Sequence, residues 1–236
     1  MRGHRVSQSE PTAAAERRRS AAKRAKMLDD ATVREIAFHV SEGQHGARNL
    51  VIFYLSHFCG LRAQEIAYLQ WDQNVLDAKG KINKTLFVGG DIGKYGRERS
   101  LEIPSALRLA LTTLRDMRPR DRYVVYRLDN LNDRRATADQ RPLLPNSIVK
   151  FFERLYEAHG LEGCSSHSGR RGFITKSART LMKTGKHSVV DVKEMAGHAD
   201  LNTTMAYIDP NPDRAGVMES MFDAMTARPR RTLRTA

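Results

Sequence analysis

The spacing of apolar residues along the chain predicts a mainly helical protein. From Asp30 onward these residues recur every three or four positions, which places them on one face of an α-helix. Gly60 and Gly160 follow two of the periodic segments, and glycine suits the left-handed conformation in which many helices end. The helices predicted in this way cover residues 30–40, 47–59, 63–69, 105–117, 146–159, 169–184 and 188–195, with a further short helix from residue 202.

The same spacing predicts which side chains face the core. Segment 47–59 is apolar nearly all round, so we expect it to be the central helix. The core residues expected in three other helices are Val33, Ile36, Ala37 and Val40 in the first, Leu107, Leu111 and Leu114 in a helix capped by Ser105, and Val149, Phe152, Leu155 and Tyr156 in a helix opened by Asn146.

A different pattern lies between Lys84 and Pro104. The run "KTLFV" is typical of a strand, and Leu101 and Ile103 alternate with charged neighbours further on. Glycine-rich sequence separates the two, which predicts a small antiparallel sheet with a tight hairpin turn around Tyr95–Gly96. The predicted fold class is therefore α+β, mainly α-helical with one small antiparallel sheet.

The chain divides into one compact domain with an extension at each end. We predict a basic arm at residues 1–28, a single domain at 29–209, and a helix with a basic tail at 210–236. The predicted C-terminal helix has an apolar stripe, which could pack on its own domain or on a neighbouring subunit. The residues of this stripe are Val217, Met218, Met221, Phe222 and Met225.

The charge of the chain indicates a polyanionic partner. Its 236 residues contain 40 Lys and Arg against 27 Asp and Glu, a formal net charge of +13. Residues 1–26 carry +6 and residues 227–236 carry +4, which leaves +3 for the part between them. Such a balance is typical of nucleic-acid-binding proteins, with the two extensions as phosphate-binding arms.

Several other classes of protein are disfavoured. The longest apolar run, Leu50–Leu61, is too short to span a bilayer, and the first 26 residues have no apolar stretch typical of a secretory signal. The two cysteines, Cys59 and Cys164, show no metal-ligand spacing and favour a reducing compartment such as the cytoplasm.

Candidate chemistry lies in four short stretches, "GLRAQEIAYLQW", "GKYGRERS", "HSGRRGF" and "GHADLNTTMAY". They contain Arg62, Lys94, His167 with Arg170, and His198 with Tyr207. Taken singly, each residue has a simpler interpretation as a surface salt bridge, a solvated cation or a hydrogen-bond donor at a helix end. For the lysine, Lys84 on the preceding strand is a rival.

Together these residue types meet the needs of phosphodiester transfer to a tyrosine. The phenol oxygen attacks phosphorus, and two guanidinium groups stabilise the charge that builds up on the non-bridging oxygens. Histidines bind the same oxygens or assist removal of the phenol proton, and a lysine protonates the departing 5′ oxygen. With so many cations, the reaction requires no metal ion, and the covalent intermediate removes the need for a nucleotide cofactor.

The four stretches resemble, in order, the active-site boxes of the tyrosine recombinases, the phage integrase family. The resemblance covers residues 30–209 and implies that this part is a DNA breaking and rejoining catalytic domain. The implied catalytic residues are Arg62, Lys94, His167, Arg170, His198 and the nucleophile Tyr207, with Glu65 orienting Arg62 and with Arg97, Arg99 and Arg171 binding DNA.

The resemblance also implies partners. These are double-stranded DNA at specific recombination sites, a homotetramer on DNA, and an accessory DNA-binding protein, with no membrane. Two departures stand out. Arg171 occupies a position where the family commonly has a second His, and only a short arm precedes the catalytic domain where integrases usually carry a DNA-clamping domain. The chain is in this respect similar to the small invertases of the family, or else it is a truncated chain.

Three alternatives stay open at this point. A type IB topoisomerase would use the same kind of chemistry without strand exchange, and a non-catalytic relative would bind DNA only. A metal-dependent hydrolase would use Glu194 with His198, four residues apart on a helix, together with His187 and Asp191.

Overall fold

The computed structural model describes residues 25–93, 96–127, 141–184 and 188–208. The predicted arm, apart from its last residues, and the predicted C-terminal helix lie outside these ranges, as do Lys94, Tyr95 and His187. In chain order the elements are α2 (Asp30–Glu42), α3 (Gly46–Cys59), α4 (Ala63–Tyr68), a π-helical turn (Trp71–Val75), β1 (Thr85–Val88), β2 (Arg99–Glu102), α5 (Ser105–Met117), α6 (Pro145–Ala158), α7 (Ser168–Thr184), α8 (Val189–Ala196) and α9 (Leu201–Met205).

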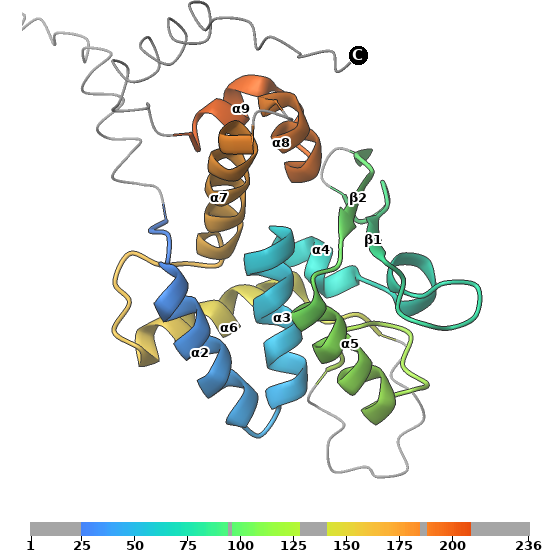
Figure 1. Ribbon diagram of the computed structural model, residues 1–236. Helices are drawn as coiled ribbons and strands as arrows, with labels where there is room; N and C mark the ends of the chain where they lie inside the picture. The colour runs from blue at the N-terminus through green and yellow to red at the C-terminus, as the bar shows by residue number, and fades with distance from the viewer. Residues whose placement is uncertain (1–24, 94–95, 128–140, 185–187, 209–236) are drawn as a thin grey trace, which may run out of the picture.

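Helix α3 is the centre of the fold, as its nearly all-round apolar sequence predicts. It packs against α2, α5 and α7, while α4 packs against α6. Figure 1 shows the two-stranded sheet at one side of this helical group, with α8 and α9 together at one end of α7. The fold class is confirmed: the described part is mainly helical and contains one small antiparallel sheet.

Several local predictions are also confirmed. The four core residues expected in α2 are all buried, and Asp29 caps this helix by accepting a hydrogen bond from the Thr32 N–H. The three leucines expected to face inward from α5 are buried as well. Gly60 ends α3 with φ of +59°, the left-handed conformation that its position predicts.

Three local predictions are wrong. Helix α5 has Pro104 in the cap position, and Ser105 is its first residue and makes no capping bond. In α6 the buried residues are Ile148, Phe152 and Tyr156. The other two residues expected in the core, Val149 and Leu155, are half-buried, because the helix is rotated slightly from the expected face.

The third correction concerns the hairpin. Strands β1 and β2 are antiparallel, with Val88 opposite Arg99, so their connection covers residues 89–98 rather than a tight turn at Tyr95–Gly96. The sequence pattern fixed the two strands but not the length of the connection, because glycines suit many loop conformations.

Candidate active site

The turn between α3 and α4 positions Arg62. After Gly60, whose Cα packs so closely on the Phe173 ring that a Cβ would collide with it, the chain enters α4 with Arg62 as its cap residue. The Arg62 N–H donates to Glu65 Oε2 at 2.8 Å, and its Nη1 donates to Glu65 Oε1 at 3.0 Å. Helix α7, which carries Phe173, therefore sets the position of the turn that holds Arg62.

A buried carboxylate joins two arginines at this point. Glu65 also accepts two hydrogen bonds from Arg99 on β2, at 3.0 and 2.7 Å, and the side chains of Glu65 and Arg99 are only 1% and 4% exposed. Burial raises the pKa of Glu65, but the hydrogen bonds and charge of Arg99, followed by those of Arg62, outweigh it and hold the pKa below its ordinary value. Glu65 is therefore an anion that holds the side chains of Arg62 and Arg99.

Arg170, in the first turn of α7, is held by the ends of two other helices. Its Nη1 donates to the Gly60 carbonyl at 2.6 Å, and its Nη2 donates to the Ala196 carbonyl at 2.5 Å. A helix C-terminus carries partial negative charge, so two such ends favour a cation between them. Burial, followed by the charge of Arg62, lowers the pKa of Arg170 to about 9, and the side chain stays cationic at neutral pH.

His198 and Tyr207 lie side by side at the end of α8 and α9. Gly197 ends α8 with φ of +62°, and a side chain there would meet Arg99 Nη1 at 3.0 Å. His198 follows it, is 4% exposed, and stacks on the Tyr207 ring with centroids 5.6 Å apart. Burial, followed by the charges of Arg170, Arg62 and Arg99, lowers the pKa of His198 to about 4, so its imidazole is neutral at pH 7.

The structure thus brings four of the predicted catalytic residues into one group. Arg62, Arg170, His198 and Tyr207 come from three separate stretches of the chain, and the charge of Arg62 acts on Arg170. His167 is exposed just before α7, where its N–H donates to Ser165 Oγ at 3.3 Å.

The three predicted DNA-binding arginines lie in different settings. Arg97 is exposed and donates to the His198 carbonyl at 3.4 Å. Arg171 is half-buried and donates to the Ala25 carbonyl at 2.8 Å. Arg99 is buried against Glu65, so the structure favours a positioning role for it over the expected contact with DNA. A signal for this was present, since Arg99 lies on the same face of its strand as the buried Leu101.

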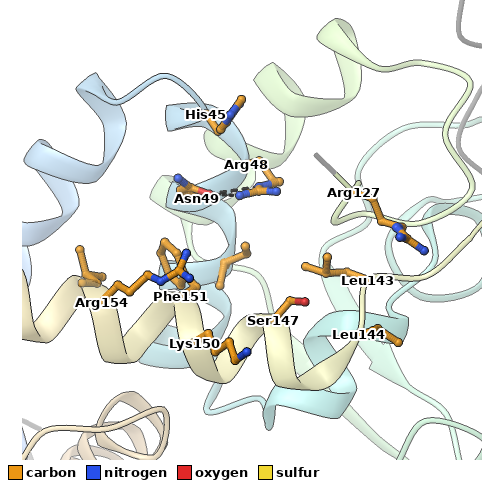
Figure 2. A pocket seen from close by; sticks show the side chains of 12 residues that line it. His45, Arg48, Asn49, Arg127, Leu143, Leu144, Ser147, Lys150, Phe151 and Arg154 are labelled. Carbon is orange, nitrogen blue, oxygen red and sulfur yellow. Dashed lines mark hydrogen bonds between the residues drawn. The ribbon is translucent and has the colours of Figure 1, made fainter. Parts of the chain in front are cut away.

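Two hollows help to delimit the site. One, of about 710 Å³, lies between β2 and α8 and includes Arg97, Gly197 and His198 in its lining. The other, of about 620 Å³, lies between α3 and α6, and Figure 2 shows Arg48, Lys150 and Arg154 around it. Arg48 is twelve residues before Gly60 on α3, roughly 18 Å away, so this second hollow is separate from the catalytic group.

Within the described ranges, no group of three or more His, Cys, Asp or Glu side chains is arranged to hold a metal ion. Of the four residues considered for a metal site, His187 lies outside those ranges. None of the described helices is both long and apolar enough to cross a membrane.

Comparison with known proteins identifies the family of the chain. The model of the Phage integrase family matches residues 26–214, which include every one of the four active-site stretches. The chain belongs to the phage integrase family. None of the curated proteins compared with the sequence matches it significantly.

Solved structures of other recombinases share the fold of this phage integrase family member. A XerA recombinase is 16% identical with a TM-score of 0.59, over 86% of this chain and 66% of its own. A XerH site-specific recombinase bound to its difH substrate is 20% identical with a TM-score of 0.59, over 84% and 54%. A Tn1549 transposon integrase in complex with circular intermediate DNA is 14% identical with a TM-score of 0.62, over 85% and 67%. The chain thus spans between about half and two thirds of the length of these proteins.

Proposed function

We propose that the protein is a site-specific tyrosine recombinase that cuts and rejoins double-stranded DNA. The observation that carries this proposal is the grouping of two arginines and a neutral histidine beside the ring of Tyr207. Membership of the phage integrase family and the fold shared with DNA-bound recombinases support it.

In the proposed reaction Tyr207 Oη attacks the scissile phosphorus and passes its proton to solvent water. A 3′-phosphotyrosyl bond forms as the bond to the 5′ oxygen breaks, and Lys94 gives that oxygen its proton. A free 5′ hydroxyl on another strand then reverses the step and joins the new ends. The bond energy is kept in the phosphotyrosine, so neither a nucleotide nor a metal ion enters the scheme.

The arginines and His198 stabilise the transition state. Arg62 and Arg170 donate to the non-bridging oxygens as their charge grows. Each terminal nitrogen of Arg170 uses one N–H on a carbonyl and keeps a second N–H. His198 donates through a single ring N–H because it is neutral at pH 7, and His167 supplies a further contact to the phosphate.

The experiment is covalent trapping on nicked suicide substrates, in which the 5′ fragment diffuses away after cleavage. A pool of duplexes with randomised sequence is incubated with the full chain in EDTA, and trapped ends are sequenced. We expect a covalent adduct with the wild type, none with Tyr207→Phe, and one preferred sequence at the cut. Absence of any adduct with the wild type would refute the proposal.

Two further measurements test the finer parts. Sites found in the trap are placed in pairs on a supercoiled plasmid, where we expect strand exchange and a tetramer on DNA. Efficient relaxation of a plasmid without such sites would instead indicate a topoisomerase.

A further inference from the structure

The side chain of Thr204 makes an unusual hydrogen bond. Thr204 is 0% exposed in α9, and its Oγ1 lies 2.9 Å from Nδ1 of His198. Thr112 and Thr113 in α5 differ from it, since each donates to the carbonyl four residues earlier in its own helix. Thr204 therefore directs its hydroxyl to a histidine of the catalytic group rather than to its own helix.

The direction of this hydrogen bond follows from burial. Among the described residues, Thr204 Oγ1 has a single hydrogen-bond partner, His198 Nδ1. If Nδ1 carried a proton and donated it, the hydroxyl proton would be left buried without an acceptor, which is costly. The hydroxyl therefore donates, and Nδ1 accepts with its lone pair.

We propose that Thr204 is a positioning residue that holds His198 in the tautomer protonated at Nε2. A neutral imidazole has one N–H, so a lone pair engaged at Nδ1 puts the proton on the other nitrogen. The consequence for catalysis rests on the proposed function: His198 is a hydrogen-bond donor to the phosphate and not the base that removes the Tyr207 proton.

The same contact joins the histidine to the nucleophile. The Tyr207 N–H donates to the Thr204 carbonyl at 2.9 Å, so Thr204 belongs to the turn that leads directly to Tyr207. Its hydroxyl fixes one edge of the imidazole while the Tyr207 ring stacks on its face. Thr204 thus sets both the protonation pattern of His198 and its position relative to the phenol.

The first test is nitrogen NMR of the wild-type chain labelled with ¹⁵N-histidine, at pH 7 and without DNA. The His198 signals are assigned by comparison with His198→Gln. We expect an unprotonated Nδ1 and a protonated Nε2. A protonated Nδ1 would overturn the proposal, and this result does not depend on DNA cleavage.

The second test uses three threonine variants. Thr204→Val keeps the shape but removes the hydroxyl, Thr204→Ser restores the hydroxyl, and Thr203→Val is the control at an exposed neighbour in the same helix. We expect a mixture of His198 tautomers and cleavage about tenfold slower in Thr204→Val. Thr204→Ser should keep the wild-type tautomer and a rate within about twofold, and the control should match the wild type.

The outcomes of these tests separate the positioning role of Thr204 from the proposed recombinase function. A folded Thr204→Val with the wild-type tautomer and rate would show that the hydroxyl does not position His198. If wild-type protein cleaves no DNA, the proposed function fails, while the NMR signals still decide the role of Thr204. If Thr204→Val does not fold, the wild-type signals and the Thr204→Ser variant decide it.

Discussion

The arginine side and the tyrosine side of the active site are built differently. On the arginine side, Glu65, Arg99 and Arg170 are buried, and each makes two or more polar contacts. On the tyrosine side, His198 has one hydrogen bond from its ring, and Tyr207 is half-buried on the turn after the short helix α9.

The difference separates two tasks. Charge stabilisation is most effective when donors are fixed before the reaction, and the core of the fold fixes the arginines. The tyrosine is held through its main chain, by a hydrogen bond from Thr175 Oγ1 to the Tyr207 carbonyl at 3.0 Å, and no hydrogen bond joins its hydroxyl to another described residue. Changes at the buried residues of the arginine side should therefore alter stability and chemistry together, whereas loss of the Tyr207 hydroxyl should alter chemistry alone.

The largest effects are expected from Arg62 and Arg170, the two arginines proposed to be catalytic. Arg62→Ala and Arg170→Ala should each slow cleavage by about a thousandfold or more, because each removes charge stabilisation from the transition state. Single-turnover cleavage of the trapped sequence measures this. A variant that cleaves at the normal rate would exclude that arginine from the reaction.

The same two variants should differ in stability. Arg170→Ala leaves two buried carbonyls without their donor and should lower the free energy of unfolding by about 2–5 kcal/mol. Arg62→Ala should lower the free energy of unfolding by less than about 1 kcal/mol, because 21% of the Arg62 side chain is exposed. Urea unfolding of both variants checks the difference, and equal losses would contradict it.

A smaller loss of activity with a large loss of stability is expected from Glu65→Gln. The substitution leaves the buried Arg99 without its anion, which should lower the free energy of unfolding by about 3–5 kcal/mol. The control is Glu194→Gln, because Glu194 is exposed on α8 and should change stability by less than about 0.5 kcal/mol. Urea unfolding of the pair decides whether Glu65 is central to the arginine side.

A weaker effect depends on pH. The folded-state pKa of His198, about 4, lies below its ordinary value of 6.5, so the unfolded chain binds more protons between these values. His198 therefore contributes stability that is present above about pH 6.5 and is lost as the pH falls toward 4. Unfolding measured from pH 7 to pH 5 should show a flatter decline in His198→Gln.

Part of the decline should survive in that variant. The pKa of His57 is also lowered, to about 3, by burial and then by the charge of Lys176. A substitution of His198 should also reduce cleavage. A substitution of His57 should not, because His57 is hydrogen-bonded to Tyr156 within the scaffold. An unchanged pH slope in His198→Gln would contradict the lowered pKa.

The smallest effect on the chemical step is expected from removal of residues 1–24, which carry seven Lys and Arg and two Glu. The cut falls before Ala25 because Arg171 donates to its carbonyl. DNA affinity and its dependence on salt should both decrease, since fewer counterions are released, while cleavage at saturating DNA stays within about twofold. An unchanged salt slope would mean that the arm does not contact phosphate.

The sequence predicted the helices well because their apolar spacing is regular, as the buried face of α2 shows. It failed at α6, where a small rotation of the helix buries Ile148 and leaves Val149 and Leu155 half-buried, and period alone does not define that rotation. The residues of the catalytic group and the supporting Glu65 could be named from resemblance to the family, whereas the supporting roles of Arg99 and Thr204 could not. Strand alternation could have shown that Arg99 is buried, but nothing in the sequence distinguishes Thr204 from a threonine bonded to its own helix.

Arg170 has a consequence for the history of proteins like this one. A descendant that had lost its activity but kept its fold would still need this guanidinium, because it donates hydrogen bonds to carbonyls at the C-terminal ends of both α3 and α8. Arg62 is partly exposed and Glu65 would retain Arg99 without it, so Arg62 and the Tyr207 hydroxyl are free to disappear once DNA is no longer cut. Decay into an inactive protein should therefore show first at positions 62 and 207 and last at position 170.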